Sequence, residues 1–123
     1  MRKDSSVTLE EDLLWRAFVD WVPDSEVLDL VRKTGIDDPA TLRDLSIGLI
    51  TRLLFEEKVI AGRPGRDGFV QWEGSTSDAV ERIVSSWLDA PTPKVILGEV
   101  VWLCATPLGL AIGETVCKRE GWC

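Results

Sequence analysis

GEVVWLCATPLG, residues 98–109, is the stretch that decides the fold. Its apolar run from Val100 to Cys104 is typical of a strand. Thr106 is a good helix N-cap, and Pro107 suits the first helical position because its missing N–H is not needed there. We therefore expect a strand that leads directly into a C-terminal helix beginning at Pro107.

A second stretch, LITRLLFEEKVIAG at residues 49–62, has the opposite order. Leucines at helical spacing are followed by Glu56 and Glu57, and then by a short strand at residues 59–61. The glycine-rich residues 62–68 predict an irregular loop, and residues 69–72 an extended segment. Together the two stretches predict a mostly helical α+β protein with a small antiparallel β-element.

Capping patterns place the other helices. Thr8 with Glu11 is a capping box, and it predicts a first helix that ends before Pro23. Asp24 or Ser25 is expected to cap a second helix, which turns Val27, Leu28 and Val31 inward. Asp38 with Pro39 is expected to open a third helix, and Ser75 with Asp78 a fourth. The inward residues of the fourth helix are expected to be Val80, Ile83, Val84, Trp87 and Leu88.

The third helix is expected to be central because its apolar stripe is wide. Gly48 lies within it and is interpreted as a close-packing contact. The stripe consists of Leu42, Leu45, Leu49, Ile50, Leu53 and Leu54.

Composition narrows the class of protein. The 123 residues fit one domain, and the formal net charge of −7 opposes contact with phosphate backbones. Most of the six tryptophans are expected in the core. Residues 100–113 are uncharged but too few to span a bilayer, so we expect buried core rather than a membrane segment.

The three cysteines, Cys104, Cys117 and Cys123, favour free thiols in a reducing cytoplasm. The alternative is a Cys117–Cys123 bridge that closes a short loop. Residues 1–8 are polar, so we expect no signal peptide.

Several kinds of chemistry are missing from the sequence. It has no histidine, no CxxC pair and no phosphate-binding loop. We expect Cys104 to be a small core residue, and Glu56 and Glu57 to form a solvated turn that leads to Lys58. The sequence thus predicts no enzyme activity, no catalytic residue, no metal site and no cofactor.

The two quoted stretches, in this order after three helices, resemble a winged-helix (winged helix-turn-helix) domain. LITRLLFEEKVIAG is similar to the end of its recognition helix and the first wing strand. WLCATPLGLAI is similar to the return strand and closing helix of several bacterial regulator families. The resemblance covers residues 9–62 and 98–113. It implies one domain, residues 1–123, in which residues 63–97 are an insertion in the wing that includes a helix.

The resemblance assigns residues 38–52 to the position of the recognition helix. DNA readers carry basic and polar side chains there, whereas this segment brings Asp37, Asp38 and Asp44. The candidate DNA contacts are Arg43 and Arg52 in the helix, and Arg63 and Arg66 in the wing loop.

We therefore expect a non-enzymatic protein-interaction module, with a protein partner or a second copy as its ligand. The alternative is a DNA-binding transcriptional regulator that uses the third helix and the Arg63/Arg66 loop. Self-association is expected through the first helix and the C-terminal helix. The C-terminal helix carries an apolar stripe for this contact, and the alternative is that this stripe packs into the core of its own chain. The residues of the stripe are Leu108, Ala111, Ile112 and Val116.

Overall fold

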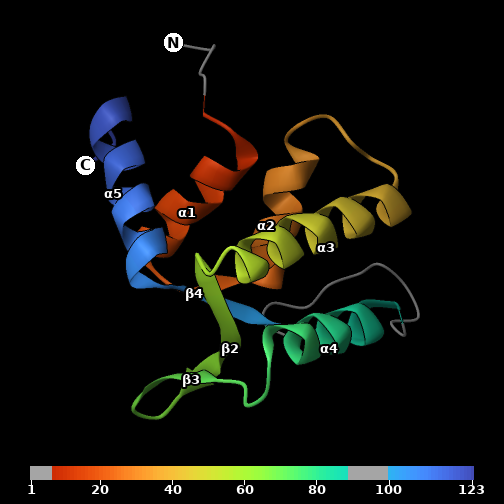
Figure 1. Cartoon of the computed structure of the whole chain (residues 1–123). Coiled ribbons are helices and arrows are strands. Elements are labelled where there is room, and N and C mark those ends of the chain that lie inside the picture. Colours follow the sequence, from red (N-terminus) through yellow and green to blue (C-terminus); the bar gives the residue numbers. More distant parts are fainter. Residues whose placement is uncertain (1–6, 89–99) are drawn as a thin grey trace.

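The computed structural model describes residues 7–88 and 100–123. Within these ranges the chain forms five helices and four strands (Figure 1). In chain order they are α1 (Leu9–Val19), β1 (Val22–Pro23), α2 (Asp24–Arg32), α3 (Pro39–Phe55), β2 (Val59–Gly65), β3 (Gly68–Gln71), α4 (Thr76–Leu88), β4 (Trp102–Ala105) and α5 (Pro107–Glu120). The expected mostly helical α+β class is confirmed.

The strands form one antiparallel sheet in the order β1-β4-β2-β3. β4 lies between β1 and β2, because Leu103 is paired with Val22 on one side and with Ala61 on the other. Side chains alternate between the two faces of a strand. The buried side chains of Val59, Ala61 and Leu103 accordingly join the helices in one hydrophobic core.

Three of the expected helix starts are confirmed in atomic detail. The Thr8 hydroxyl accepts a hydrogen bond from the Glu11 N–H, and the Glu11 carboxylate accepts one from the Thr8 N–H. Asp38 caps α3 by accepting from the Thr41 N–H at 2.9 Å. Ser75 and Asp78 cap each other in the same way as Thr8 and Glu11.

The fourth confirmed start is that of α5, where the Thr106 hydroxyl accepts from the Gly109 N–H and Pro107 occupies the first turn. The expected cap of α2 is wrong. α2 begins at Asp24 with Pro23 as its N-cap residue and without a side-chain cap. Strand pairing sets this start, because the Asp24 N–H donates to the Val101 carbonyl at 3.0 Å.

The irregular loop expected at residues 62–68 is also wrong. β2 continues to Gly65 and forms a tight hairpin with β3, in which Gly65 is paired with Gly68. Gly62 is required inside this hairpin, because a Cβ atom there would lie 2.0 Å from the Val70 carbonyl oxygen. Figure 1 shows the β2–β3 hairpin projecting away from the helices. The expected insertion, residues 63–97, thus begins within a strand, and its last nine residues lie outside the described ranges.

The packing of the structure corrects the expectations for Leu45, Leu88, Gly48 and the tryptophans. Leu45 and Leu88 were expected to face inward, and both are exposed. Gly48 makes no close-packing contact, because a Cβ atom built on it has no neighbour within 4 Å. Trp87 is the single buried tryptophan, so the expectation that most of them lie in the core is wrong.

The thiols of Cys117 and Cys123 form a disulfide, and Cys104 is free. The expectation of three free thiols is therefore wrong, and the alternative bridge is present. Its cause is local: Gly121 ends α5 in the left-handed conformation and turns the chain back on the helix. The Cα atoms of the two cysteines consequently lie 5.3 Å apart. The same turn places the Trp122 ring 4.8 Å from that of Trp15.

Candidate interaction site

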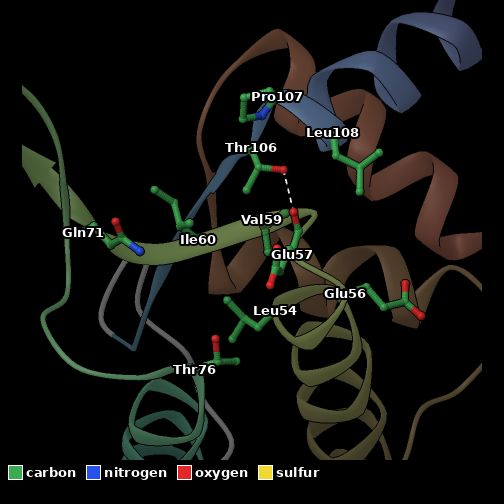
Figure 2. A pocket seen from close by; sticks show the side chains of 10 residues that line it. All are labelled: Leu54, Glu56, Glu57, Val59, Ile60, Gln71, Thr76, Thr106, Pro107 and Leu108. Carbon is green, nitrogen blue, oxygen red and sulfur yellow. Dashed lines mark hydrogen bonds between the residues drawn. The ribbon is translucent and has the colours of Figure 1, made fainter.

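A groove of about 450 Å³ lies between the end of α3, the first half of β2, the end of β3 and the starts of α4 and α5 (Figure 2). We call it the α3–α5 groove. Half of the residues that line it are apolar, two are acidic and three are uncharged polar residues. They are Leu54, Val59, Ile60, Pro107 and Leu108; Glu56 and Glu57; and Gln71, Thr76 and Thr106.

The backbone at Glu57 shapes one wall of the groove. Glu57 follows the C-cap of α3 and has a φ of 60°, a left-handed conformation that is uncommon for residues other than glycine. It allows the Lys58 N–H to reach the Leu53 carbonyl at 3.0 Å and so closes the helix. A glutamate in this place carries conformational strain that a glycine would not.

Two hydrogen bonds join this wall to the start of α5. The Thr106 hydroxyl donates to the Glu57 carbonyl at 2.7 Å, the bond drawn in Figure 2. The Thr106 N–H donates to the Lys58 carbonyl at 3.0 Å. Gly109 allows this approach, because a Cβ atom on it would lie 2.0 Å from the Lys58 carbonyl oxygen. The groove therefore lies at a hydrogen-bonded junction between segments that are about 50 residues apart in the sequence.

The charged side chains beside the groove form a network of ion pairs that does not include Glu57. Lys58 Nζ lies 2.8 Å from Glu56 and also binds Glu10, and Arg52 contacts both of these glutamates. The hydrogen bond from Lys58 is the main reason that the pKa of Glu56 is lowered. Glu10 is the main reason that the pKa of Lys58 is raised. Glu57 is exposed and has no ion pair among the described residues.

The structure does not bring the four candidate DNA contacts together. Arg43 binds Asp44 at 3.1 Å, and Arg52 belongs to the network above. They lie nine residues apart on α3, which at 100° per residue places them on opposite sides of the helix. Arg63 and Arg66 lie exposed in the β2–β3 hairpin and have no carboxylate partner within the described ranges.

The outward face of α3 carries apolar and polar side chains where a DNA reader is basic, because exposed Thr41 and Asp44 lie beside Leu45 and Phe55. Leu45 is 45% exposed and Phe55 is 55% exposed, and Gly48 and Arg52 lie between them on the same face. We call these four residues the α3 stripe. Its single cation, Arg52, is neutralised by Glu10 and Glu56.

The four residues of the expected self-association surface divide into two pairs. Val116 is buried and Ile112 packs against the core, where α5 lies along α1. Leu108 and Ala111 are exposed, and Leu108 also lines the α3–α5 groove. Ile112 and Val116 thus pack into the core of their own chain, as the alternative expectation states.

Cys104 is half-buried and lies outside the hydrophobic core, so the expectation of a core residue is wrong. Its partial burial raises the pKa of the thiol. No group of three metal-binding side chains is present in residues 7–88 and 100–123. Over the same residues, each helix is too short or too polar to cross a bilayer.

Sequence reasoning missed the α3–α5 groove because its walls come from four separate segments. The one local signal was the Glu56–Glu57–Lys58 run directly after a helix, where a glycine is the usual residue. Searches with this chain found no matching protein-family model, no matching curated protein and no matching solved structure.

Proposed function

We propose that this chain is a non-enzymatic protein-interaction module, built on a winged-helix scaffold as a single domain. The support for the scaffold is the order of its parts. α1, β1, α2 and α3 are followed by β2, and β4 returns between β1 and β2. In this interpretation β3 and α4 belong to the insertion at residues 63–97, in the position of the wing.

The observation that carries the proposed function is the α3–α5 groove, which combines an apolar floor with the free carboxylate of Glu57. Ile60, Pro107 and Leu108 offer apolar contact, and a buried apolar side chain is the usual anchor of an interface. Glu57 offers a charged acceptor that a guanidinium or ammonium group matches. The partner is therefore a peptide segment with a large apolar side chain next to an arginine or lysine.

Net charge supports the same partner chemistry. With a formal net charge of −7, the chain repels acidic surfaces and attracts basic ones. This attraction speeds the association of the chain with a basic partner. A second copy is the less suitable occupant of this groove, because it carries the same negative charge.

Fluorescence anisotropy with a labelled peptide of about nine residues, in which leucine and arginine alternate, tests the proposal. We expect saturable binding that weakens about tenfold or more when glutamate replaces arginine or serine replaces leucine. Glu57→Gln and Leu108→Ser should each weaken binding. Glu81→Gln is the matched control, because it removes an equal charge from α4 outside the groove. Equal losses in Glu57→Gln and Glu81→Gln would mean that only net charge attracts the peptide, and the proposed site would be wrong.

One observation favours a second function, DNA binding through the wing. The guanidinium groups of Arg63 and Arg66 have no carboxylate partner in the described part of the chain, unlike those of Arg43 and Arg52. Binding of a labelled mixed-sequence duplex at about 50 mM salt, lost in the double variant Arg63→Ala/Arg66→Ala, would establish it. No anisotropy change under these conditions would exclude this alternative.

A further inference from the structure

One edge of β2 is open at Val59, where the strand lines the α3–α5 groove. On the other edge, the Thr106 N–H donates to the Lys58 carbonyl at 3.0 Å. Hydrogen-bonded pairs alternate along an antiparallel ladder, so Ile60 is the next residue of β2 that bonds to β4. Val59 lies between these two and directs its N–H and C=O groups to the open edge. Neither group has a hydrogen-bond partner among the described residues.

β3 covers the same edge farther along β2 but ends before it reaches Val59. The last bond between the two segments runs from the Trp72 N–H to the Ala61 carbonyl, at 3.0 Å. In this register Gly74 would lie opposite Val59. Gly74 instead has a φ of 106° and turns the chain into α4. The ladder is therefore interrupted where the groove begins.

The separation leaves a space beside Val59. A pocket of about 60 Å³ has Val59 and Ala61 of β2 among its lining residues, together with Trp72 and Gly74. The pocket adjoins the α3–α5 groove, because five residues line both: Leu54, Val59, Ile60, Gln71 and Thr76. Figure 2 shows Val59 on the part of β2 that runs between Thr76 and Thr106. The open edge is thus continuous with the groove.

Burial makes the open edge unusual. Val59 is 1% exposed. Main-chain N–H and C=O groups in such a place are almost always hydrogen-bonded, because an unpaired group costs free energy. One residue of an added strand supplies both missing partners, since the two residues of a hydrogen-bonded pair exchange two bonds.

We infer that the peptide partner binds in the α3–α5 groove as an added β-strand that pairs with Val59. This inference rests on the proposed function and adds the binding mode, in which main-chain bonds hold the peptide and its side chains give specificity. Successive side chains of a strand point to opposite faces, so alternating leucine and arginine form one apolar and one basic face. The groove offers apolar contact at Ile60 and Leu108 and a carboxylate at Glu57.

Charge favours this occupant over an edge strand of a second copy. The chain has a formal net charge of −7, so a basic strand is attracted to the open edge, whereas a second copy is repelled.

Fluorescence anisotropy on the full chain tests the binding mode with two modified forms of the nine-residue leucine–arginine peptide. One form carries an N-methyl group on every leucine, and the other on every arginine. Each change removes main-chain donors and keeps all the side chains. An added strand turns successive N–H groups alternately toward and away from β2, and a shift of the repeating peptide by two residues preserves this alternation. We expect one form to bind about tenfold or more weakly than the other.

Hydrogen exchange followed by NMR locates the added strand on the protein. The Val59 amide is the reporter, and the Ile60 amide is the matched control because it already faces β4. The unmethylated peptide should slow exchange at Val59 about tenfold relative to exchange at Ile60.

Three results would overturn the inference. Equal affinities of the two methylated peptides, or an unchanged ratio of exchange at Val59 and Ile60, would exclude the added strand while binding of the unmethylated peptide still supported the proposed function. A Val59 amide that exchanges as slowly as Ile60 in the free chain would mean that another part of the chain covers this edge. Absence of binding by the unmethylated peptide would overturn the proposed function and this inference together.

Discussion

Gly113 of α5 lies directly against Leu14 of α1: a Cβ atom built on Gly113 would stand 2.4 Å from the Leu14 carbonyl oxygen. It would also lie 2.7 Å from the Cβ atom of Phe18. The two helices thus meet at backbone distance, and any larger residue at position 113 must push them apart.

We therefore expect Gly113→Ala to lower the free energy of unfolding by about 2 kcal/mol, the usual cost of overpacking a well-filled contact. Urea denaturation measures the change. Gly48→Ala is the control, because it adds the same methyl group in open space and should raise the stability of the monomer by up to about 1 kcal/mol. Equal midpoints for the two variants would contradict the close approach of α1 and α5.

Glu57→Gly should stabilise the fold by about 1 kcal/mol, because it relieves the left-handed backbone at a φ of 60°. Chemical denaturation gives the gain in stability, and the peptide anisotropy measurement gives the loss of binding that the missing carboxylate causes. Glu57→Gln separates the two effects, since it removes the charge and keeps the strain. A loss of stability in Glu57→Gly would show that the glutamate side chain itself supports the fold.

The pKa of Glu11 is lowered, mainly because its carboxylate accepts hydrogen bonds from Arg119, and also because it accepts one from the Thr8 N–H. A carboxyl group whose pKa is lower in the folded state adds stability above its ordinary pKa of 4.5, and this stability is lost as the pH falls below that value. We expect Glu11→Gln to flatten the stability profile between about pH 5 and pH 3. Thermal melts across this range test it. Glu81→Gln, at an exposed site on α4, should leave the profile unchanged.

Reduction of the Cys117–Cys123 disulfide should release the chain end that holds Trp122 against Trp15. The closed loop is short, so we expect a loss of about 2 kcal/mol in unfolding free energy. Tryptophan emission should change with it, since both rings become more exposed to water. Cys123→Ser should reproduce both effects without reductant. If Cys104→Ser produced them instead, the assigned pairing of the cysteines would be incorrect.

Local sequence signals predicted the helix starts at Thr8, Asp38, Ser75 and Thr106, because a capping residue and its partner lie only three positions apart. The start of α2 was missed, since the Asp24 N–H is taken by Val101, which lies far away in the sequence. The continuation of β2 through Gly62 was missed for the same reason. Pairing with Gln71 and Trp102 overrides the tendency of a glycine-rich stretch to form a loop.

The candidate site was predictable only in its parts. The sequence predicts self-association through Leu108, and it predicts a solvated turn at Glu56 and Glu57. Their shared position around the α3–α5 groove depends on the hydrogen bonds from Thr106 to Glu57 and Lys58, which join distant segments. The exposed side of Gly48 was not predictable either, because helical spacing gives the period of a face but not which neighbour covers it.

Gly62 of β2 and Trp102 of β4 are direct partners across the sheet. The segment between Gly62 and Trp102 therefore leaves the β2–β4 pair and returns to it at the same pair of residues. Changes in the length of the intervening stretch need no shift in register elsewhere, provided that the surface under Ile83 and Trp87 of α4 stays covered. This place in the fold is accordingly where evolution or an engineer can graft, trim or exchange a subdomain with the least disturbance to the remainder.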